Sequence, residues 1–373
     1  MRIEAALMTK VGQPLKIEKI ELASPGPKEV LVEIKATGVC HSDLNALHDS
    51  TTPCPCVLGH EASGIVQEVG RDVRLVRPGD RVVLSWLPYC GTCTFCTRGK
   101  FTLCEMAFGP MFAGTLLDGT TRLQRPDHSD EKVYHYSLLS TFASHAVVPE
   151  MSCIKIPNQM PFAEASLLGC GVGTGFGAVV RTAKVEPGSH VAVFGIGGVG
   201  ISAIQAARIS GAERIFACDL KAQNLEFAKQ FGATDTILIQ DTPAEETIRA
   251  ATGGSGVDYA IDATGSPVAF QSAFSSLKKG GSLVVVGAFA SGKSISLPGG
   301  GFHRMGKSIQ GSFYGDINPL RDLPMLAELY LKGKLQLSEL VLEKIPLKQI
   351  NEAFATFANP QALTAGRSVV VLE

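Results

Sequence analysis

Four cysteines between Trp86 and Phe108 have the spacing of a metal site. They follow the pattern C-x2-C-x2-C-x7-C, and such short gaps let one stretch of chain place four thiolates around a single ion. Zn²⁺ is the natural occupant, because thiolate sulfurs satisfy this borderline-soft cation. A site with four protein ligands has no open position, so we predict that this zinc is structural. The four ligands are Cys90, Cys93, Cys96 and Cys104.

The second motif with chemical content is the glycine-rich stretch 195–200, which reads G-x-G-x-x-G. It follows an apolar strand predicted at Val191–Phe194 and opens a helix predicted at Val199–Ser210, and an acid, Asp219, ends the next strand. In this context the glycines permit a tight turn, a close approach to pyrophosphate at the helix N-terminus, and close packing of helix on sheet. The alternative is a glycine-rich turn with a chance acid.

A dinucleotide bound at this turn would place its ribose near Asp219. Its carboxylate should accept hydrogen bonds from the ribose hydroxyls and repel a 2′-phosphate, which favours NAD over NADP. Lys221 can partly offset that repulsion. The residues assigned to this coenzyme site are Gly195, Gly197, Gly198, Val199, Gly200, Asp219 and Lys221.

Three scattered residues, Cys40, His60 and Cys170, fit a zinc site with an open position, of the Cys₂His type known for alcohol dehydrogenases. Sequence distance does not show that they meet, but their contexts are informative. Cys40 follows a predicted strand, His60 precedes one, and Cys170 lies where the character of the sequence changes. The alternative is that these are buried side chains without a metal.

The elements that must position these residues fall into two regions, as expected for a chain of 373 residues. The first has short strands with Gly and Pro between them, at Val30–Lys35, Ser63–Val69 and Asp80–Leu84, and a long polar connection at 107–140. From residue 191 strands alternate with helices, which predicts a parallel α/β sheet. Beyond Val191–Phe194 and Val199–Ser210, the predicted elements are Ile215–Cys218, 221–231, Thr236–Ile239, 243–251, Tyr259–Asp262, 267–277, Ser282–Val286, 322–332, 347–357 and Arg367–Leu372.

Composition limits the possible partners. Charged residues are 18% and apolar residues 45% of the chain, and the formal net charge is −1. Without basic blocks, neither nucleic acid nor an anionic membrane is an expected partner. The start Met1-Arg2-Ile3-Glu4 is unlike a signal peptide, and no apolar run reaches the ~18 residues of a membrane span. Ten cysteines in such a chain favour a reducing compartment, so we expect a cytoplasmic protein.

With these motifs, the chain resembles the zinc-containing medium-chain dehydrogenases, and most the long-form alcohol dehydrogenases of the liver and glutathione-dependent formaldehyde type. The resemblance covers essentially the whole length. It implies an α/β fold in which a Rossmann domain, a doubly wound parallel sheet at 172–313, is inserted in a discontinuous β-rich catalytic domain with a GroES-like barrel. That domain would comprise 1–171 and 314–373 and include the zinc lobe 86–108. The segments carrying the resemblance are Gly38–Asp43, Leu58–Gly64, Cys90–Cys104, Asp118–Arg122, Leu168–Gly175 and Ala192–Gly200.

The resemblance also implies a catalytic zinc, the second per chain, on Cys40, His60 and Cys170. Glu61 would lie beside it as a neighbour or transient ligand, and Asp43 would hydrogen-bond the ligating imidazole and fix its tautomer. The implied coenzyme contacts are Thr174 near the nicotinamide, His41 in place of a pyrophosphate-binding arginine, and Arg367 to phosphate and to Glu61. A homodimer is expected through the sheet edge near Ser294–Phe313.

The implied reaction is hydride transfer between a small primary alcohol and NAD, giving the aldehyde. Ser42 would take the hydroxyl proton, and the family then uses a histidine three residues on, where this chain has Asn45. Asparagine cannot take up a proton at neutral pH, so His48 or His41 would have to substitute.

Aromatic residues at the pocket positions favour an aryl or allylic alcohol, although core packing explains each of them nearly as well. These positions are Trp86, Phe108, Tyr136, Ser137, Ala288 and Phe289. Alternatives are a glutathione-dependent formaldehyde dehydrogenase, disfavoured by Phe108 where that branch has an arginine and by the lack of an acid in Pro53–Cys56, and a non-catalytic zinc- and NAD-binding relative. The zinc-free quinone reductases are contradicted by Cys90–Cys104.

Overall fold

The chain forms two compact units in a computed structural model, which describes residues 1–128, 130–240, 243–290, 292–297, 302–359, 362 and 365–372. The first unit comprises Met1–Cys170 and most of the chain from Asn318 onward, and the second comprises Gly171–Ile317. The chain therefore leaves the first unit after Cys170, builds most of the second, and returns at Asn318.

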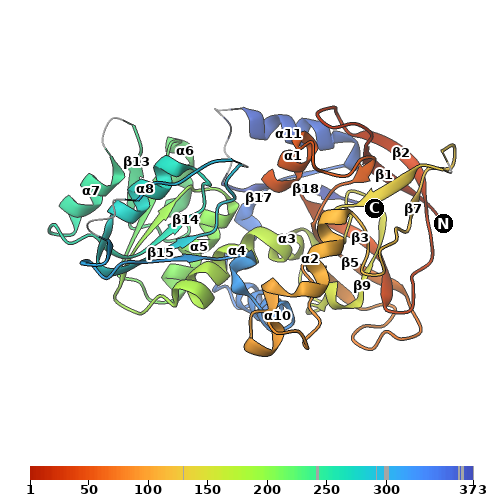
Figure 1. The fold of residues 1–373 in the computed structure, drawn as a ribbon, viewed down its shortest axis with the longest axis horizontal. Helices are drawn as coiled ribbons and strands as arrows, with labels where there is room; N and C mark the ends of the chain where they lie inside the picture. The colour runs from red at the N-terminus through yellow and green to blue at the C-terminus, as the bar shows by residue number, and fades with distance from the viewer. Residues whose placement is uncertain are drawn as a thin grey trace. The chain divides into compact units, whose positions relative to one another are not determined.

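The second unit is built on a parallel sheet of six strands, in the order β13-β12-β11-β14-β15-β16. Figure 1 shows helices on both faces of this sheet, with α8 on one side of the strands and α5 on the other. The alternation predicted from the sequence is confirmed. The strands are β11 (His190–Phe194), β12 (Arg214–Asp219), β13 (Asp235–Leu238), β14 (Val257–Asp262), β15 (Leu277–Val285) and β16 (Ser308–Gly311), and the helices α5 (Gly198–Ile209), α6 (Ala222–Lys229), α7 (Ala244–Ala251) and α8 (Pro267–Ser275).

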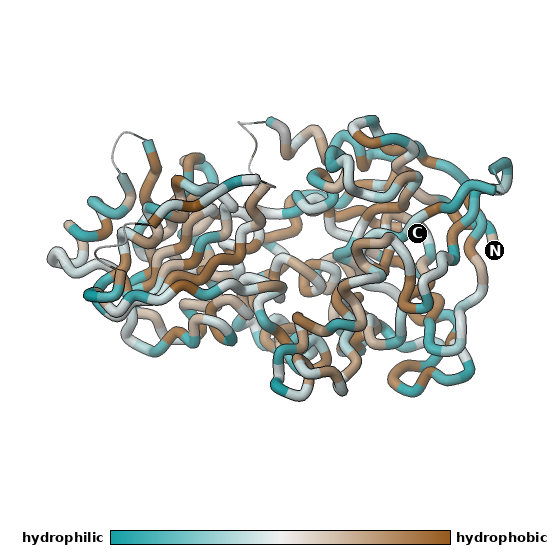
Figure 2. The backbone as a smooth tube through the Cα atoms, in the orientation of Figure 1, coloured by the Kyte–Doolittle hydropathy of each residue, from teal (hydrophilic) through white to brown (hydrophobic). Residues whose placement is uncertain are grey.

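Burial on both faces explains the composition of these strands. A parallel sheet covered by helices excludes water from both sides, so its strands are nearly continuous apolar runs. Phe194 and Phe216 from adjacent strands share a core with Phe270 of α8, and all three are essentially inaccessible. Figure 2 shows this as hydrophobic colouring along the strands and hydrophilic colouring at many of the turns.

A helical segment that the sequence analysis did not predict runs from Phe162 to Ala183. It comprises α3 (Phe162–Leu167), π-helical turns at Leu168–Val172 and Ala178–Ala183, and α4 (Gly173–Gly177). Its glycines lower helix propensity but permit close packing. A Cβ on Gly175 would lie 2.2 Å from the carbonyl oxygen of Val199. This is the one described helix long and apolar enough to cross a membrane, and 94% of its apolar 18-residue stretch is buried inside the protein, as in a core helix.

The first unit contains a small closed barrel and a larger sheet. The barrel strands are β1 (Arg2–Met8), β2 (Lys16–Leu22), β7 (Leu123–Gln124), β8 (Lys132–His135) and β4 (Cys56–Val57). The seven-stranded sheet follows the order β10 (Cys153–Lys155), β6 (Arg81–Leu84), β5 (Glu61–Val69), β3 (Glu29–Gly38), β18 (Arg367–Val371) and β17 (Val341–Ile345), and β9 (His145–Pro149) pairs with β3. Its helices include α1 (His41–His48), α10 (Pro319–Leu331) and α11 (Ile350–Ala358). Together, the barrel and the parallel sheet confirm the predicted fold class.

The long connection predicted at 107–140 is wrong in part, because it contains a helix and two strands. Helix α2 spans Glu105–Ala113, and β7 and β8 lie further along. The pair Gly109-Pro110 argues against a helix, but the ends of α2 carry ordinary signals. Glu105 lies in the first turn, and Gly114 ends the helix in the left-handed conformation, with φ +67.

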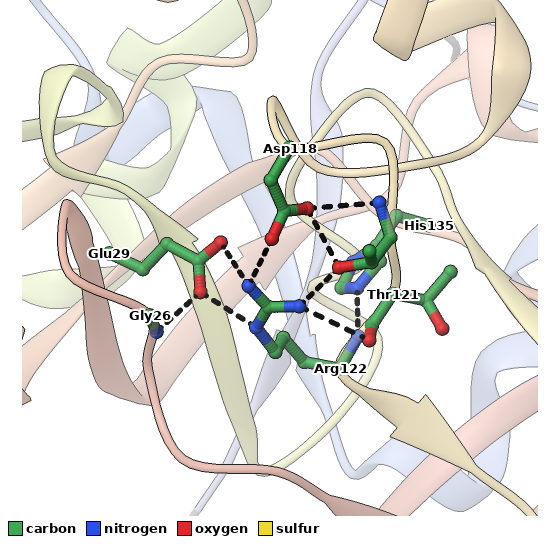
Figure 3. A network of polar contacts seen from close by, with 7 residues as sticks. Gly26, Glu29, Asp118, Thr121, Arg122 and His135 are labelled. Atoms are coloured by element: carbon green, nitrogen blue, oxygen red, sulfur yellow. Dashed lines mark hydrogen bonds and ion pairs between the residues drawn. The ribbon is translucent and has the colours of Figure 1, made fainter.

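Arg122 connects the barrel to the larger sheet through a polar network (Figure 3). Its guanidinium donates to both oxygens of Glu29, at 2.8 and 2.9 Å, and to Asp118 at 2.6 Å. Nε2 of His135 accepts from the backbone N of Arg122 at 3.2 Å. Burial, followed by the charge of Arg122, lowers the pKa of His135 to about 3, so the imidazole stays neutral. Because the pKa of His135 is lower in the folded than in the unfolded chain, its neutral form stabilises the fold fully above the unfolded pKa of about 6.5. This stabilisation is lost as the pH falls from there toward the pKa of the folded protein.

We expect Arg122→Met to lower the free energy of unfolding by about 3 kcal/mol, because it leaves the buried Glu29 carboxylate without its cation. Urea-induced unfolding followed by circular dichroism checks this. The matched control is Arg71→Met, whose side chain is 83% exposed and which should change stability by less than about 0.5 kcal/mol. Equal unfolding midpoints for the two variants would contradict the structural role of the network.

Candidate metal centres and coenzyme cleft

The structure brings Cys40, His60, Glu61 and Cys170 together in the first unit. One ligand atom from each lies within 4.8 Å of the others, and the side chains of Cys40, His60 and Glu61 are buried. Cys40 ends the loop after β3, His60 directly precedes β5 and Glu61 begins it, and Cys170 lies in the π-helical turn Leu168–Val172. Two sulfurs and an imidazole are the donor set that Zn²⁺ takes with an open fourth position, so these residues fit the metal.

Asp43 fixes the orientation of His60. Its Oδ1 lies 2.9 Å from Nδ1 of His60 and also accepts from the backbone N of Gly59, at 3.1 Å. Its Oδ2 accepts from the backbone N of Cys40, at 3.1 Å. Because a carboxylate only accepts, Nδ1 carries a proton and Nε2 is left for a metal. Asp43 therefore ties two of the candidate ligands together through main chain and side chain.

The two thiols of the cluster share a hydrogen bond that shifts their pKa values in opposite directions. A hydrogen bond from Cys170 lowers the pKa of Cys40 well below its ordinary value, and the same bond raises the pKa of Cys170. Burial lowers the pKa of His60, but Asp43 outweighs it and holds that pKa well above the ordinary value. Of these three groups Cys40 therefore carries the negative charge, whereas the thiol of Cys170 and the imidazole of His60 hold protons that a bound divalent cation would displace.

Glu61 lies at the same cluster, and its carboxylate is buried. Among the described residues, no hydrogen-bond donor satisfies either of its buried oxygens. The Nε of Arg367, at the start of β18, lies 3.5 Å from Oε2. Burial, followed by the charge of Cys40, raises the pKa of Glu61 to about 7. A buried carboxylate of this kind is a second indication that the cluster accommodates a cation.

The zinc lobe at 86–108, called the cysteine lobe from here on, also forms a complete set of ligands. The sulfurs of Cys90, Cys93, Cys96 and Cys104 lie within 4.8 Å of one another. Backbone N–H groups stabilise the thiolates: the N of Cys93 donates to Sγ of Cys90 at 3.3 Å, and the N of Cys90 donates to Sγ of Cys104 at 3.2 Å. Hydrogen bonds from Thr92 and Cys93 lower the pKa of Cys90 to about 6. These features fit a closed zinc site.

The glycine turn of the second unit has the geometry of a phosphate cradle. Gly195 has a φ of +85, and Gly197 is the N-cap of α5. A Cβ on Gly200 would lie 2.0 Å from the carbonyl oxygen of Gly195, so only glycine fits there. The helix therefore begins directly at the turn, and its unpaired backbone N–H groups can receive an anion.

Asp219 lies beside that turn at the end of β12. Its Oδ2 accepts from the backbone N of Ile196 at 2.6 Å, and its Oδ1 accepts from the backbone N of Lys221 at 2.8 Å. The amide of Asn224, 2% exposed, donates to Oδ1 at 3.3 Å. A cavity of about 850 Å³ adjoins Gly195 and Asp219, and the exposed side chains of Leu220 and Val268 line it. The cavity can accept a flat aromatic ring with a diol beside the carboxylate.

Two family profiles match the chain, an alcohol dehydrogenase GroES-like domain over residues 26–158 and a zinc-binding dehydrogenase over residues 198–330. The S-(hydroxymethyl)glutathione dehydrogenase of Saccharomyces cerevisiae is 38% identical over 368 residues, 96% of this chain and 94% of the relative. The chain belongs to the zinc-binding medium-chain alcohol dehydrogenase family. The corresponding enzyme of Synechocystis is 40% identical, covering 95% of this chain and 96% of the relative.

Solved structures of this family agree. A zinc-binding alcohol dehydrogenase domain protein of Burkholderia ambifaria has a TM-score of 0.94 and 36% identity, covering 100% of this chain and 99% of that one. The benzyl alcohol dehydrogenase of Acinetobacter calcoaceticus has a TM-score of 0.92 and 34% identity, covering both chains fully. The protein is thus a zinc-dependent oxidoreductase of the alcohol dehydrogenase family, whose members use NAD or NADP. The non-catalytic alternative is not retained.

Other predicted residues take the following places in this dehydrogenase. Ser42, Asn45 and His48 are exposed positions on α1, and each lies about one helical turn after the one before it. His41 is also exposed, and its ring centroid lies 4.9 Å from that of Phe357. Thr174 is buried on α4 in the second unit. The roles assigned to these residues, and to Lys221, stay predictions.

Two residues make contacts at the sites that the sequence did not predict. Tyr136 contacts His60 and Ser42, and Asn224 supports Asp219. Neither a tyrosine directly after a short strand nor an asparagine on a helix carries a sequence signal for such contacts. Phe289, named for the substrate pocket, lies 6.3 Å from Phe270 at the core of the second unit, in agreement with the packing alternative.

Proposed function

We propose that this enzyme oxidises primary alcohols, aryl or allylic ones in particular, to aldehydes with NAD as coenzyme. Cys40, His60 and Cys170 would hold the catalytic zinc, and the Cys90–Cys104 lobe the structural zinc. The observation that carries the proposal is the buried Cys₂His cluster with Asp43 on the imidazole. When bound, the metal supplies a Lewis acid for the alcohol oxygen, and the nicotinamide supplies the hydride acceptor.

The chain's own residues then bind, orient and move the proton. Asp43 keeps His60 in the tautomer that presents Nε2, so the ligand does not need to reorient during turnover. Ser42 is the residue we assign to relay the hydroxyl proton of the alcohol: its Oγ accepts that proton while its own hydroxyl proton passes on toward His48 or His41. It is the second residue of α1, directly after Cys40 and His41. Arg367 and Glu61 would balance charge beside the metal, with Arg367 also facing coenzyme phosphate.

The coenzyme preference rests on Asp219. Its carboxylate is fixed by three donors and faces the cavity that would take adenosine. A ribose with two free hydroxyls gains hydrogen bonds there, whereas a 2′-phosphate would meet like charge. Gly195, Gly197, Gly198, Val199 and Gly200 would bind the pyrophosphate. This supports NAD over NADP.

The last step of proton release has a distinctive residue in this chain. Asn45 lies one helical turn beyond Ser42 and cannot accept a proton at neutral pH. We therefore expect Asn45→His to raise turnover at neutral to low pH and to introduce a pH dependence near the histidine pKa of about 6.5. The pH–rate profile, measured where hydride transfer limits turnover, is the test. A pH–rate profile unchanged by the substitution would refute the idea that position 45 lies on the path of proton release.

Aromatic side chains at the metal cluster support an aryl or allylic substrate. The ring of Trp86 lies 6.4 Å from that of His60, and the ring of Tyr136 lies 5.6 Å away, both edge-on. Flat apolar walls beside a polar reaction centre favour substrates that carry a π-system next to the carbinol carbon. The likeness to a benzyl alcohol dehydrogenase agrees with this choice.

Oxidation of S-(hydroxymethyl)glutathione is the second candidate, because the named relatives at 38% and 40% identity carry that activity. Phe108 on α2 argues against this activity, because at the matching position the glutathione-dependent branch has an arginine that binds a glutathione carboxylate. No acid of the expected kind is present in Pro53–Cys56.

A substrate screen tests the proposal. It compares benzyl, cinnamyl and aliphatic primary alcohols with S-(hydroxymethyl)glutathione, each with NAD and NADP, by the absorbance of the reduced coenzyme. We expect the highest kcat/KM for an aryl or allylic alcohol with NAD. A higher value for S-(hydroxymethyl)glutathione would establish the second candidate instead.

We also propose a homodimer formed at β16, the edge strand of the parallel sheet. Ser308, Gln310 and Gly311 on this strand are exposed, which leaves backbone groups for pairing with a second copy. The expected segment Ser294–Phe313 includes residues 298–301, which lie outside the described residues. The mass in solution, measured by light scattering, tests the dimer.

A further inference from the structure

Tyr136 makes two contacts that connect the metal cluster to the start of α1. Its hydroxyl donates to the carbonyl oxygen of Ser42, with the oxygens 3.1 Å apart. Its ring meets the imidazole of His60 edge-on, with centroids 5.6 Å apart and planes at 74°. One side chain therefore contacts both a candidate metal ligand and the residue to which we assign the proton transfer.

The backbone after Tyr136 is held in an unfavourable conformation. Ser137, Leu138 and Ser140 have φ values of +50, +63 and +59, in the left-handed region that residues other than glycine rarely adopt. The turn is closed on Tyr136 itself: its backbone N donates to Oγ of Ser140 at 3.0 Å, and its carbonyl accepts from the N of Leu139 at 3.0 Å. Such strain persists only where the surroundings enforce it, and it clusters at functional sites.

The surroundings do enforce it. Leu138 and Leu139 on the turn are fully buried. The chain then runs beside the segment that carries His60, with the N of Thr141 donating to the carbonyl of Gly59 at 3.0 Å. A Cβ on Gly59 would lie 2.6 Å from the backbone N of Phe142, so the two segments are in direct contact. The strained turn is thus anchored at both ends and presents Tyr136 in one position.

We propose that Tyr136 is a positioning residue, whose hydroxyl holds the first turn of α1 so that Ser42 stays at the correct distance from the alcohol oxygen bound beside His60. The inference rests on the proposed role of Ser42 and extends it. A phenylalanine would keep the ring packed on His60 but leave the Ser42 carbonyl without this donor. Because proton transfer requires close alignment, a small loosening of the first turn slows turnover more than it weakens binding.

A double-mutant cycle tests this with the zinc-loaded full-length enzyme, using the best alcohol from the substrate screen. Tyr136→Phe, Ser42→Ala and the double variant are compared for kcat, KM and zinc content. The matched control is Tyr134→Phe, two residues earlier on β8, where Lys132 lies over the ring. We expect Tyr136→Phe to lower kcat about tenfold with KM changed less than about twofold, and the control to stay within about twofold of the wild type.

The outcomes separate this inference from the function on which it rests. If Tyr136 acts through Ser42, adding Tyr136→Phe to Ser42→Ala lowers kcat by less than about twofold more. The same tenfold loss in both backgrounds would overturn the inference while leaving the role of Ser42 intact. A Ser42→Ala enzyme with wild-type kcat would instead refute the proton-transfer role itself. Loss of zinc from Tyr136→Phe would show a structural effect on the cluster and would also overturn the inference.

Discussion

Cys170→Ser should reduce kcat/KM for alcohol oxidation by at least about a thousandfold, because a metal that contributes about 4 kcal/mol of transition-state stabilisation would be lost or displaced. The zinc content should fall from two ions per chain toward one, since the cysteine lobe keeps its own ligands. Enzyme assays together with metal analysis by mass spectrometry check both expectations.

The matched control is Cys153→Ser, which changes a buried thiol of the same unit that belongs to neither ligand set. Burial raises the pKa of Cys153 well above its ordinary value, as for an inert core thiol. We expect this variant to retain two zinc ions and its activity, although its stability can fall. An active Cys170→Ser enzyme with both zinc ions would exclude Cys170 as a catalytic ligand.

The second large effect concerns the choice of coenzyme. Asp219→Asn keeps an acceptor for the backbone N of Ile196 but removes the negative charge at the ribose. We expect the ratio of kcat/KM with NAD to kcat/KM with NADP to fall about a hundredfold, partly from weaker ribose hydrogen bonds and partly from relief of repulsion. Initial rates at a fixed alcohol concentration, with each coenzyme varied, measure the ratio.

Glu226→Gln serves as the control for this ratio. The side chain of Glu226 is 73% exposed on α6 and does not line the cavity. The substitution therefore removes one negative charge from the same unit without changing the cavity. The ratio should stay within about twofold of the wild type. If both variants shifted the ratio alike, net charge rather than Asp219 would account for the preference.

The motifs with local spacing were predictable from the sequence. Cys90, Cys93, Cys96 and Cys104 lie close in the chain, so their convergence requires only a short loop. The glycine turn and Asp219 were predictable because a strand, a turn and a helix follow each other directly. In both cases local chain geometry determines which side chains meet, and sequence shows local geometry well.

The convergence of Cys40, His60 and Cys170 required more than spacing. These residues come from three separate elements, and only the family resemblance indicated that they meet before the structure placed them together. The helical segment Phe162–Ala183, which carries Cys170, was missed because its glycines lower helix propensity. Tertiary packing, with Gly175 directly against Val199, overrides that propensity.

The contacts of Tyr136 and Asn224 could not be inferred from sequence at all. Each depends on where a long or buried side chain points after distant segments have packed. Three left-handed residues after Tyr136 carry no glycine to announce the turn. The positioning groups around a site are therefore the part that needs a structure, because tertiary contacts select conformations that local preference disfavours.

The most direct test of the proposed metal chemistry is the anomalous scattering from crystals of the enzyme with NAD, recorded on both sides of the zinc absorption edge. We expect two zinc peaks per chain, one among the sulfurs of Cys90, Cys93, Cys96 and Cys104 and one between Cys40, His60 and Cys170. A single peak in the cysteine lobe, from protein whose alcohol dehydrogenase activity is intact, would contradict this expectation.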